Sequence, residues 1–220
     1  AFKAGQYISV AVTLPDGARQ IRQYSLSNAE QASTYRISIK CETGDLHTPQ
    51  GRVSNWLHQH AKVGGQLQIS HPYGEFTPDL HASTPLVLIS AGVGITPMLA
   101  MLNTLAQQQS TRALWFLHAS RSLQYVPHLE ELSAATQILP KLNLALYVES
   151  QSALETSLSV RVGRTHLTEW SFSAALNAQY YLCGPLPFMV EQWQALLAQG
   201  IPPQQIHREV FGPESLNQAG

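Results

Sequence analysis

Charged residues and cysteines are scarce in this sequence, and each shortage excludes a class of protein. Charged side chains make up only 12% of the 220 residues and the formal net charge is −1, so no basic stripe is available to bind nucleic acid. The two cysteines, Cys41 and Cys183, lie far apart and form no disulfide framework, which fits a reducing compartment. There is no CxxC pair and no metal-ligand spacing. His58 and His60 would point to different sides of a helix, so we expect them at the surface.

Long apolar runs and a targeting segment are also missing. No apolar stretch approaches the length that spans a bilayer, so no membrane partner is expected. The first seven residues resemble a loop that enters a strand rather than a signal peptide, which predicts a cytoplasmic protein. The chain is long enough for two small domains or one large one, and its hydrophobic content of 44% is ordinary for a globular protein.

The most informative stretch, residues 86–98, joins an uncharged strand, a glycine loop and a helix. Gly92 and Gly94 let the backbone turn sharply and approach a ligand closely, because neither has a Cβ atom. Pro97 suits a first helical position, where a missing N–H costs nothing. A strand, a glycine turn and a helix N-terminus together favour phosphate binding, so we interpret the stretch as a dinucleotide site. An ordinary strand–helix turn is the alternative, since GxG alone is a short motif.

The first part of the chain, up to about residue 80, has the pattern of a small antiparallel barrel. It ends near a linker at residues 78–83. A turn signal at Pro15-Asp16-Gly17 follows the first alternating segment. The sequence predicts strands over residues 6–12, 21–26, 35–40 and 67–70, and a helix over 53–61.

Two features of this barrel are suited to hold a nucleotide. Arg22 and Tyr24 share one face of a strand, where an arginine beside an aromatic ring can clamp a phosphate and stack on a flat ring. The alternative is an exposed strand with a cation–π or charge pair. Ser54 can cap a helix whose free N–H groups would face an anion. A plain N-cap is the alternative there.

The second part of the chain alternates strands with helices, which predicts a parallel sheet covered on both faces. Ligands of such sheets bind at the carboxyl ends of the strands. The loops at Gly92, at Ala119-Ser120-Arg121 and at Cys183-Gly184-Pro185 all follow predicted strands. The predicted strands are 86–89, 113–118, 142–148, 180–183 and 206–211, and the predicted helices after the one that begins at Pro97 are 126–135 and 187–198.

The glycine loop departs from the standard NAD fingerprint. A third glycine is missing, and no Asp or Glu ends the second strand to hold a ribose. Arg121 stands there instead, and a cation at that position favours the 2′-phosphate of NADPH. A solvated surface arginine is the alternative.

Five motifs, at residues 22–25, 51–57, 92–98, 183–185 and 209–213, occur in one order along nearly the whole chain. In that order they resemble the ferredoxin–NADP reductase superfamily, and more closely the reductase part of flavohaemoglobins. The resemblance implies an FAD-binding β-barrel over residues 1–82 and a Rossmann-like, parallel-sheet NAD(P)H-binding α/β domain over residues 83–220. Its cofactors would be FAD and NAD(P)H, with haem only if a globin domain lies upstream.

The resemblance also implies roles for single residues. Tyr24 would pack on the isoalloxazine, Arg22 would meet the pyrophosphate, and Ser25 would lie near flavin N5. The residues implied to bind the cofactors are Tyr7, Arg22, Gln23, Tyr24, Ser25, Gly51, Val53, Ser54, Gly92, Val93, Gly94, Ile95, Thr96, Pro97, Cys183, Gly184, Pro185, Val210, Phe211, Gly212 and Pro213.

Ser25, Cys183 and Glu209 are implied at catalytic positions. Thr96 and Cys183 would face the nicotinamide, Glu209 would tune the flavin or relay a proton, and Phe211 would cover the ring where the nicotinamide enters. Each has a simpler alternative: Cys183 and Phe211 as core residues, and Glu209 as a surface charge.

The sequence departs from the family pattern at its start, where two barrel strands that normally precede residue 5 are absent. We expect either a fragment of a longer protein or a natural truncation with weakened FAD binding, since an opened barrel exposes strand edges. The implied reaction is hydride transfer from NAD(P)H to FAD, followed by single electrons passing to the haem of a nitric oxide dioxygenase. The alternatives are a reductase that serves a separate ferredoxin or oxygenase, and a non-catalytic nucleotide-sensing module.

Overall fold

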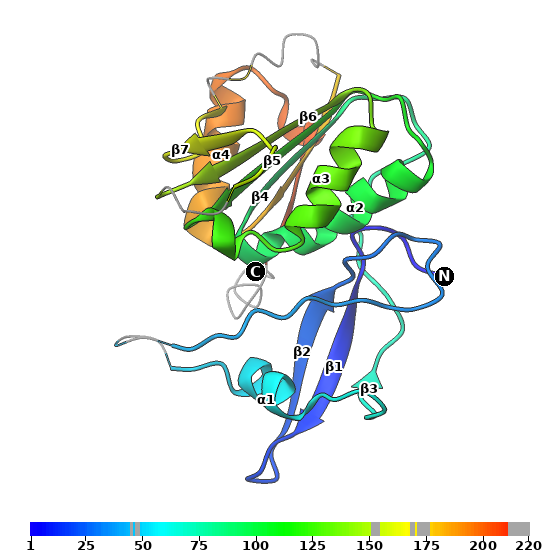
Figure 1. Ribbon diagram of the computed structural model, residues 1–220, viewed down its shortest axis with the longest axis vertical. Coiled ribbons are helices and arrows are strands. Elements are labelled where there is room, and N and C mark those ends of the chain that lie inside the picture. The colour runs from blue at the N-terminus through cyan, green and yellow to red at the C-terminus, as the bar shows by residue number, and fades with distance from the viewer. Residues whose placement is uncertain (45, 47–48, 151–154, 168–169, 171–176, 211–220) are drawn as a thin grey trace.

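The computed structural model describes residues 1–44, 46, 49–150, 155–167, 170 and 177–210, which form two lobes around separate sheets (Figure 1). We call residues 1–76 the N-terminal lobe and residues 86–210 the C-terminal lobe. The first carries a three-stranded antiparallel sheet and the second a six-stranded parallel sheet. The predicted combination of a small antiparallel β-structure and an α/β unit is therefore confirmed.

In the central strand of the N-terminal lobe, buried apolar side chains alternate with more exposed ones. Ile8, Val10 and Val12 point to one side of the central strand and are buried against Val53 and Leu57 of the covering helix. The sheet order is β2-β1-β3. The elements are β1 (Tyr7–Thr13), β2 (Arg19–Ser25), α1 (Arg52–His60) and β3 (Gln68–Ile69).

The prediction of a strand over residues 35–40 is wrong. Only Ile37 is paired, through a single bridge to Leu26, although Ile37 and Ile39 do pack against the small core as their alternation implies. A strand needs a continuous ladder of backbone hydrogen bonds. Within the described residues this segment shares no further ladder pairing with a strand, so side-chain alternation alone does not make it regular.

In the C-terminal lobe all neighbouring strands run parallel, in the order β7-β6-β5-β4-β8-β9. The central strand β4 is buried along its whole length, as its uncharged sequence predicts. The strands are β4 (Leu86–Ala91), β5 (Leu114–Ser120), β6 (Leu142–Val148), β7 (Val160–Val162), β8 (Gln179–Cys183) and β9 (Ile206–Glu209). The helices are α2 (Ile95–Gln107), α3 (Leu129–Ile138) and α4 (Leu186–Ala198).

Two helix starts in this lobe differ from the prediction, and one strand was not predicted. Helix α2 begins two residues before Pro97, yet the proline still lies in the first turn, where its missing N–H costs no hydrogen bond. Helix α3 begins three residues later than predicted, because His128 takes a left-handed conformation with φ of 57° just before it. Strand β7 was not predicted, since three residues are too few to show a period.

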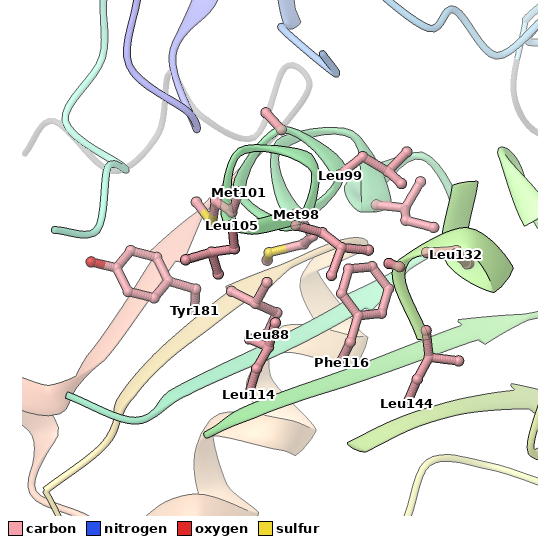
Figure 2. Close-up of a cluster of buried hydrophobic side chains, with 14 of the residues drawn as sticks. Leu88, Met98, Leu99, Met101, Leu105, Leu114, Phe116, Leu132, Leu144 and Tyr181 are labelled. Atoms are coloured by element: carbon pink, nitrogen blue, oxygen red, sulfur yellow. The ribbon is translucent and has the colours of Figure 1, made fainter. Parts of the chain in front are cut away.

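Helices cover both faces of the parallel sheet. Figure 2 shows Leu88 and Phe116 of neighbouring strands pointing toward Met98 of α2, with Leu132 of α3 beside them in the same buried cluster. Met189 of α4 belongs to a second cluster on the other face. Because α2 and α3 also face the N-terminal lobe (Figure 1), this helix layer is shared between the two lobes. None of the helices in the described part of the chain has the length and apolar character that a bilayer crossing requires.

Candidate functional site

One pocket of about 520 Å³ lies at the carboxyl edge of the parallel sheet. Gly92 after β4, Arg121 after β5 and Pro185 after β8 all line it, so the structure brings together the three loops that the sequence placed at one rim. Residues 38–40 of the N-terminal lobe line it as well. The pocket is therefore formed by both lobes.

The two glycines of the loop have different tasks. Gly92 has φ of +54°, and a Cβ atom there would meet no protein atom within 4 Å, so this residue leaves the space beside it open. Gly94 has an ordinary helical φ of −61°, but its Cβ would lie 2.4 Å from the carbonyl oxygen of Cys183. Gly94 thus allows the start of α2 to pack directly on the end of β8.

The start of α2 supplies hydrogen-bond donors to the pocket. A 3-10 turn (Gly92–Gly94) runs directly into α2, and the Ile95 N–H donates to the carbonyls of Gly92 and Val93. The N–H groups at the start of such a turn have no intrahelical partner and favour an anion. Thr96 is buried, lines the pocket, and donates its hydroxyl to the carbonyl of Val93 at 3.1 Å. This arrangement can hold the phosphates of a nucleotide.

The pocket also contains residues that the sequence analysis did not select. The Tyr125 ring is 58% exposed, and the Arg121 guanidinium lies over it at 5.4 Å from the centroid, which leaves an aromatic face for a planar ligand. Arg164 pairs with Glu191 at 2.8 Å, and Lys40 reaches the pocket from the N-terminal lobe. Of these residues, only Tyr125 had a signal in the sequence, because it follows Arg121 by four residues.

A second group of predicted residues meets at the end of β2. Ser25 is buried opposite Tyr7 of β1, and its Oγ has no hydrogen-bond partner among the described residues. Tyr24 is half-buried on the other face of the strand, and burial raises the pKa of its phenol. Gln23 lies within 3.5 Å of the Tyr7 hydroxyl and 3.4 Å of the Tyr73 hydroxyl. Tyr73 was not predicted.

Arg22 is exposed, and its guanidinium donates to the carbonyl of Ile21 at 2.7 Å. It shares a face of β2 with Tyr24, as predicted, because the strand alternates. The side chain is therefore on the surface and available to an anion.

The prediction that Ser54 caps a helix is wrong. Helix α1 begins at Arg52 after Gly51, and Ser54 lies inside the first turn, where its hydroxyl donates back to the Gly51 carbonyl at 3.2 Å. A Cβ atom on Gly51 would lie 2.5 Å from that hydroxyl oxygen, so the glycine permits the close turn. Val53 is a core residue, and only its backbone remains available to a ligand. The free N–H groups at this helix start are still present.

Cys183 and Glu209 lie side by side at the ends of β8 and β9. The thiol is fully buried, and burial and the nearby Glu209 carboxyl raise its pKa well above the usual value, so it is a neutral thiol. Burial raises the pKa of Glu209 to about 7, and its Oε2 has no hydrogen-bond partner in the described part of the chain. A pKa near 7 lets Glu209 gain or lose a proton near neutral pH.

Tyr7 and Glu209 belong to different lobes. Burial raises the pKa of Tyr7 most, and the charges of Tyr73 and Glu209 raise it further. Val210 is half-buried against the core near α4. Phe211, Gly212 and Pro213 lie outside the described residues.

Comparison with known proteins agrees with this geometry. Residues 88–194 match the model of the oxidoreductase NAD-binding domain family. The FAD/NAD-binding domain of nitric oxide dioxygenase from Vibrio cholerae superposes with a TM-score of 0.85 and 37% identity, over 96% of this chain and 86% of that one. This chain belongs to the family of flavohaemoglobin-type FAD/NAD-binding domains.

The relatives that contain this region are longer than this chain. A flavohemoprotein of Rhizobium meliloti is 42% identical over 219 residues, which are 97% of this chain and 53% of that protein. A flavohemoglobin from Malassezia yamatoensis, with bound FAD and heme, has a TM-score of 0.78 and 36% identity over 96% of this chain and 52% of its own. The chain thus spans about half the length of the curated relatives it matches.

We expect Gly94→Ala to lower the free energy of unfolding by about 1–3 kcal/mol. Its φ of −61° suits alanine, so the loss would come from overlap with the Cys183 carbonyl. Chemical denaturation measures it. Unchanged or increased stability would contradict the close approach, because alanine is the better helix former.

A second prediction concerns the charge on Glu209. Burial raises its folded-state pKa from 4.5 to about 7, so stability that is present below pH 4.5 is lost as the pH rises toward 7. Glu209→Gln carries no such charge. Its stability relative to the wild type should therefore grow from a small difference at pH 5 to about 1–3 kcal/mol at pH 8.

Chemical denaturation at the two pH values checks this prediction. Glu130→Gln is the matched control, because Glu130 is an exposed glutamate on α3. The control should show the same difference from the wild type at both pH values. A Glu209→Gln effect that is equally independent of pH would refute the burial of an ionisable group there.

Proposed function

We propose that this chain is the reductase module of a flavohaemoglobin-type nitric oxide dioxygenase, an FAD-dependent oxidoreductase that passes electrons from NAD(P)H to a haem. One structural observation supports the proposal beyond family membership. The pocket at the carboxyl edge of the parallel sheet is lined from both lobes, by residues 38–40 of the N-terminal lobe and by Gly92 and Arg121 of the C-terminal lobe. A ligand on one lobe and a ligand in the pocket would meet at this place.

The N-terminal lobe fits a flavin nucleotide. The half-buried ring of Tyr24 offers a surface for a planar system, and the buried Ser25 hydroxyl, which lacks a partner among the described residues, would be satisfied by a ligand atom. Arg22 and the first N–H groups of α1 would hold the pyrophosphate. Gly51, Val53 and Ser54 contribute to this site through the backbone.

The C-terminal lobe fits a pyridine dinucleotide. The first N–H groups of the turn at Gly92–Gly94, which leads into α2, would hold its pyrophosphate. Arg121 and Tyr125 would meet the adenosine end, and Thr96 and Cys183 the nicotinamide end. Residues 1–82 would then be the FAD-binding domain and residues 83–220 the NAD(P)H-binding domain.

Bound FAD would supply the hydride and one-electron chemistry that side chains cannot provide. The task of the chain is to hold the two rings in reacting geometry and to exclude water. Ser25 would offer its hydroxyl to the ring beside it. Glu209, with a pKa of about 7, would hold or release a proton at its carboxyl near neutral pH. The buried neutral thiol of Cys183 would make an uncharged wall rather than a nucleophile.

The electron acceptor is part of the same proposal. The Malassezia flavohemoglobin that this chain resembles contains both FAD and heme. We assign the acceptor to a globin domain, either in the same polypeptide or in a separate protein. No nucleic acid is expected to take part.

Anaerobic titration of the FAD-supplied protein tests the proposal. The visible flavin absorbance should bleach stoichiometrically with NADH or NADPH, and much faster than that of free FAD without protein. Globin-coding sequence immediately upstream would assign the acceptor. Bound nucleotide with no bleaching would instead indicate a non-catalytic sensor and would refute the enzyme assignment.

Arg121 should favour NADPH over NADH. Its guanidinium lines the pocket after β5, so Arg121→Ala is expected to lower the ratio of kcat/KM for NADPH to that for NADH about tenfold, which is about 1.4 kcal/mol. Lys141→Ala, which removes the same charge from the opposite edge of the sheet, should leave the ratio unchanged. An unchanged ratio in Arg121→Ala rejects the role.

A further inference from the structure

Six polar side chains connect the two lobes beside the pocket. Arg36, Ser27 and Ser38 belong to the N-terminal lobe, and Asn103, His128 and Glu131 to α2, the loop before α3 and α3 itself. We call these six residues the interlobe cluster. The sequence analysis selected none of them, because their partners lie up to 95 residues apart.

Glu131 is the centre of the interlobe cluster. Its two carboxylate oxygens accept hydrogen bonds from Arg36 at 2.7 and 2.8 Å. Asn103 donates to one oxygen at 2.7 Å, and His128 Nδ1 lies 2.7 Å from the other. Burial would raise the pKa of Glu131, yet the hydrogen bonds from Arg36, Asn103 and His128 together hold it below its usual range, so the carboxylate is ionised at neutral pH.

Arg36 connects Glu131 to the segment that follows β2. Its guanidinium donates to the Ser27 carbonyl and, through Nε, to the Ser27 hydroxyl at 3.1 Å. Ser27 follows the buried Ser25 by two residues, and its N–H donates to the Arg36 carbonyl at 2.8 Å. Ser25 is therefore connected to Arg36 through the two peptide bonds that lead to Ser27 and through the hydrogen bonds between Ser27 and Arg36.

The other end of the interlobe cluster reaches the nucleotide pocket. Asn103 lies on α2, whose first turn borders the pocket, and its amide also approaches the Ser27 carbonyl at 3.4 Å. His128 Nε2 lies 2.8 Å from the hydroxyl of Ser38, which lines the pocket. The same six side chains therefore touch the element that holds Ser25 and the helix that holds Thr96.

The exposure of the central pair argues against a role in stability alone. The side chains of Arg36 and Glu131 are 36% and 30% exposed, and ion pairs with that much solvent contribute little to folding. Their geometry is nevertheless bidentate, and three further residues, Ser27, Asn103 and His128, hydrogen-bond to the pair. Such an arrangement fixes the orientation of the two side chains more than it adds to the free energy of folding.

We propose that Glu131 is a positioning residue for hydride transfer. Through its hydrogen bonds with Arg36 and Asn103, it fixes the orientation of one lobe relative to the other. In that orientation the ligand beside Ser25 lies against the ligand in the pocket. This inference rests on the proposed function. Misplacement of reacting groups by about 1 Å costs about a hundredfold in rate. A contact that binds neither ligand can therefore control the reaction.

Glu131→Gln tests the role. The amide keeps the shape, but its NH2 group would face donors on Arg36 or Asn103. We expect anaerobic flavin reduction by NADH to slow about 10–100-fold, with a larger primary deuterium isotope effect and unchanged FAD content. Hydrogen–deuterium exchange of the NADH-free protein should rise in residues 26–38 and not in β4. Glu130→Gln, one residue away and exposed, should match the wild type in every measurement.

Arg36→Lys supplies a second, milder variant. Lysine keeps the charge but cannot hold Glu131 and Ser27 at once, so it should reproduce part of the rate loss. The double variant should be no slower than Glu131→Gln alone, because both residues act through one contact.

The results separate three cases. A lower thermal midpoint for Glu131→Gln with unchanged reduction rate, isotope effect and exchange would overturn the positioning role and leave the proposed function standing. Additive losses in the double variant would also overturn it. A wild-type protein whose flavin is reduced by neither NADH nor NADPH would overturn the proposed function, and the positioning role with it.

Discussion

The packing of α2 is the constraint on which the rest of the structure depends. This helix begins against the backbone of Cys183, where Gly94 has no room for a side chain, and its apolar side chains fill the space above β4 and β5 (Figure 2). Its other side meets the N-terminal lobe, where the Thr104 hydroxyl accepts a hydrogen bond from the Glu30 N–H at 3.1 Å. Because one helix is fixed by the sheet, the glycine loop and the N-terminal lobe, a shift in any of them would move the pocket.

Local patterns in the sequence were enough to predict the C-terminal lobe. The uncharged run at β4, the alternation at β6 and the glycine loop at Gly92 each depend on neighbours a few residues away, and the structure has all three. The carboxyl edge followed from the general rule for parallel sheets. The same reasoning failed at residues 35–40, where the period is present but the described residues supply no partner strand. It also failed at β7, which is too short to have a period.

The site was predictable only in part, for a related physical reason. The motif around Arg22 and the loop around Gly92 are continuous in sequence, so they could be selected directly. The pocket lining from both lobes and the group around Glu131 are formed by folding, from segments that are far apart in the sequence. Ser54 shows a third limit: a residue type that favours caps occupies the first turn instead, because its hydroxyl bonds the Gly51 carbonyl.

The pocket wall is contributed by two lobes, since Lys40 lines it together with Gly92 and Arg121. A molecule that fills it touches both lobes, and its binding free energy is then shared by two folding units. By thermodynamic linkage, such a ligand couples the unfolding of one lobe to that of the other. Lobes that can unfold separately without the ligand then unfold together, as one cooperative unit, when the pocket is saturated.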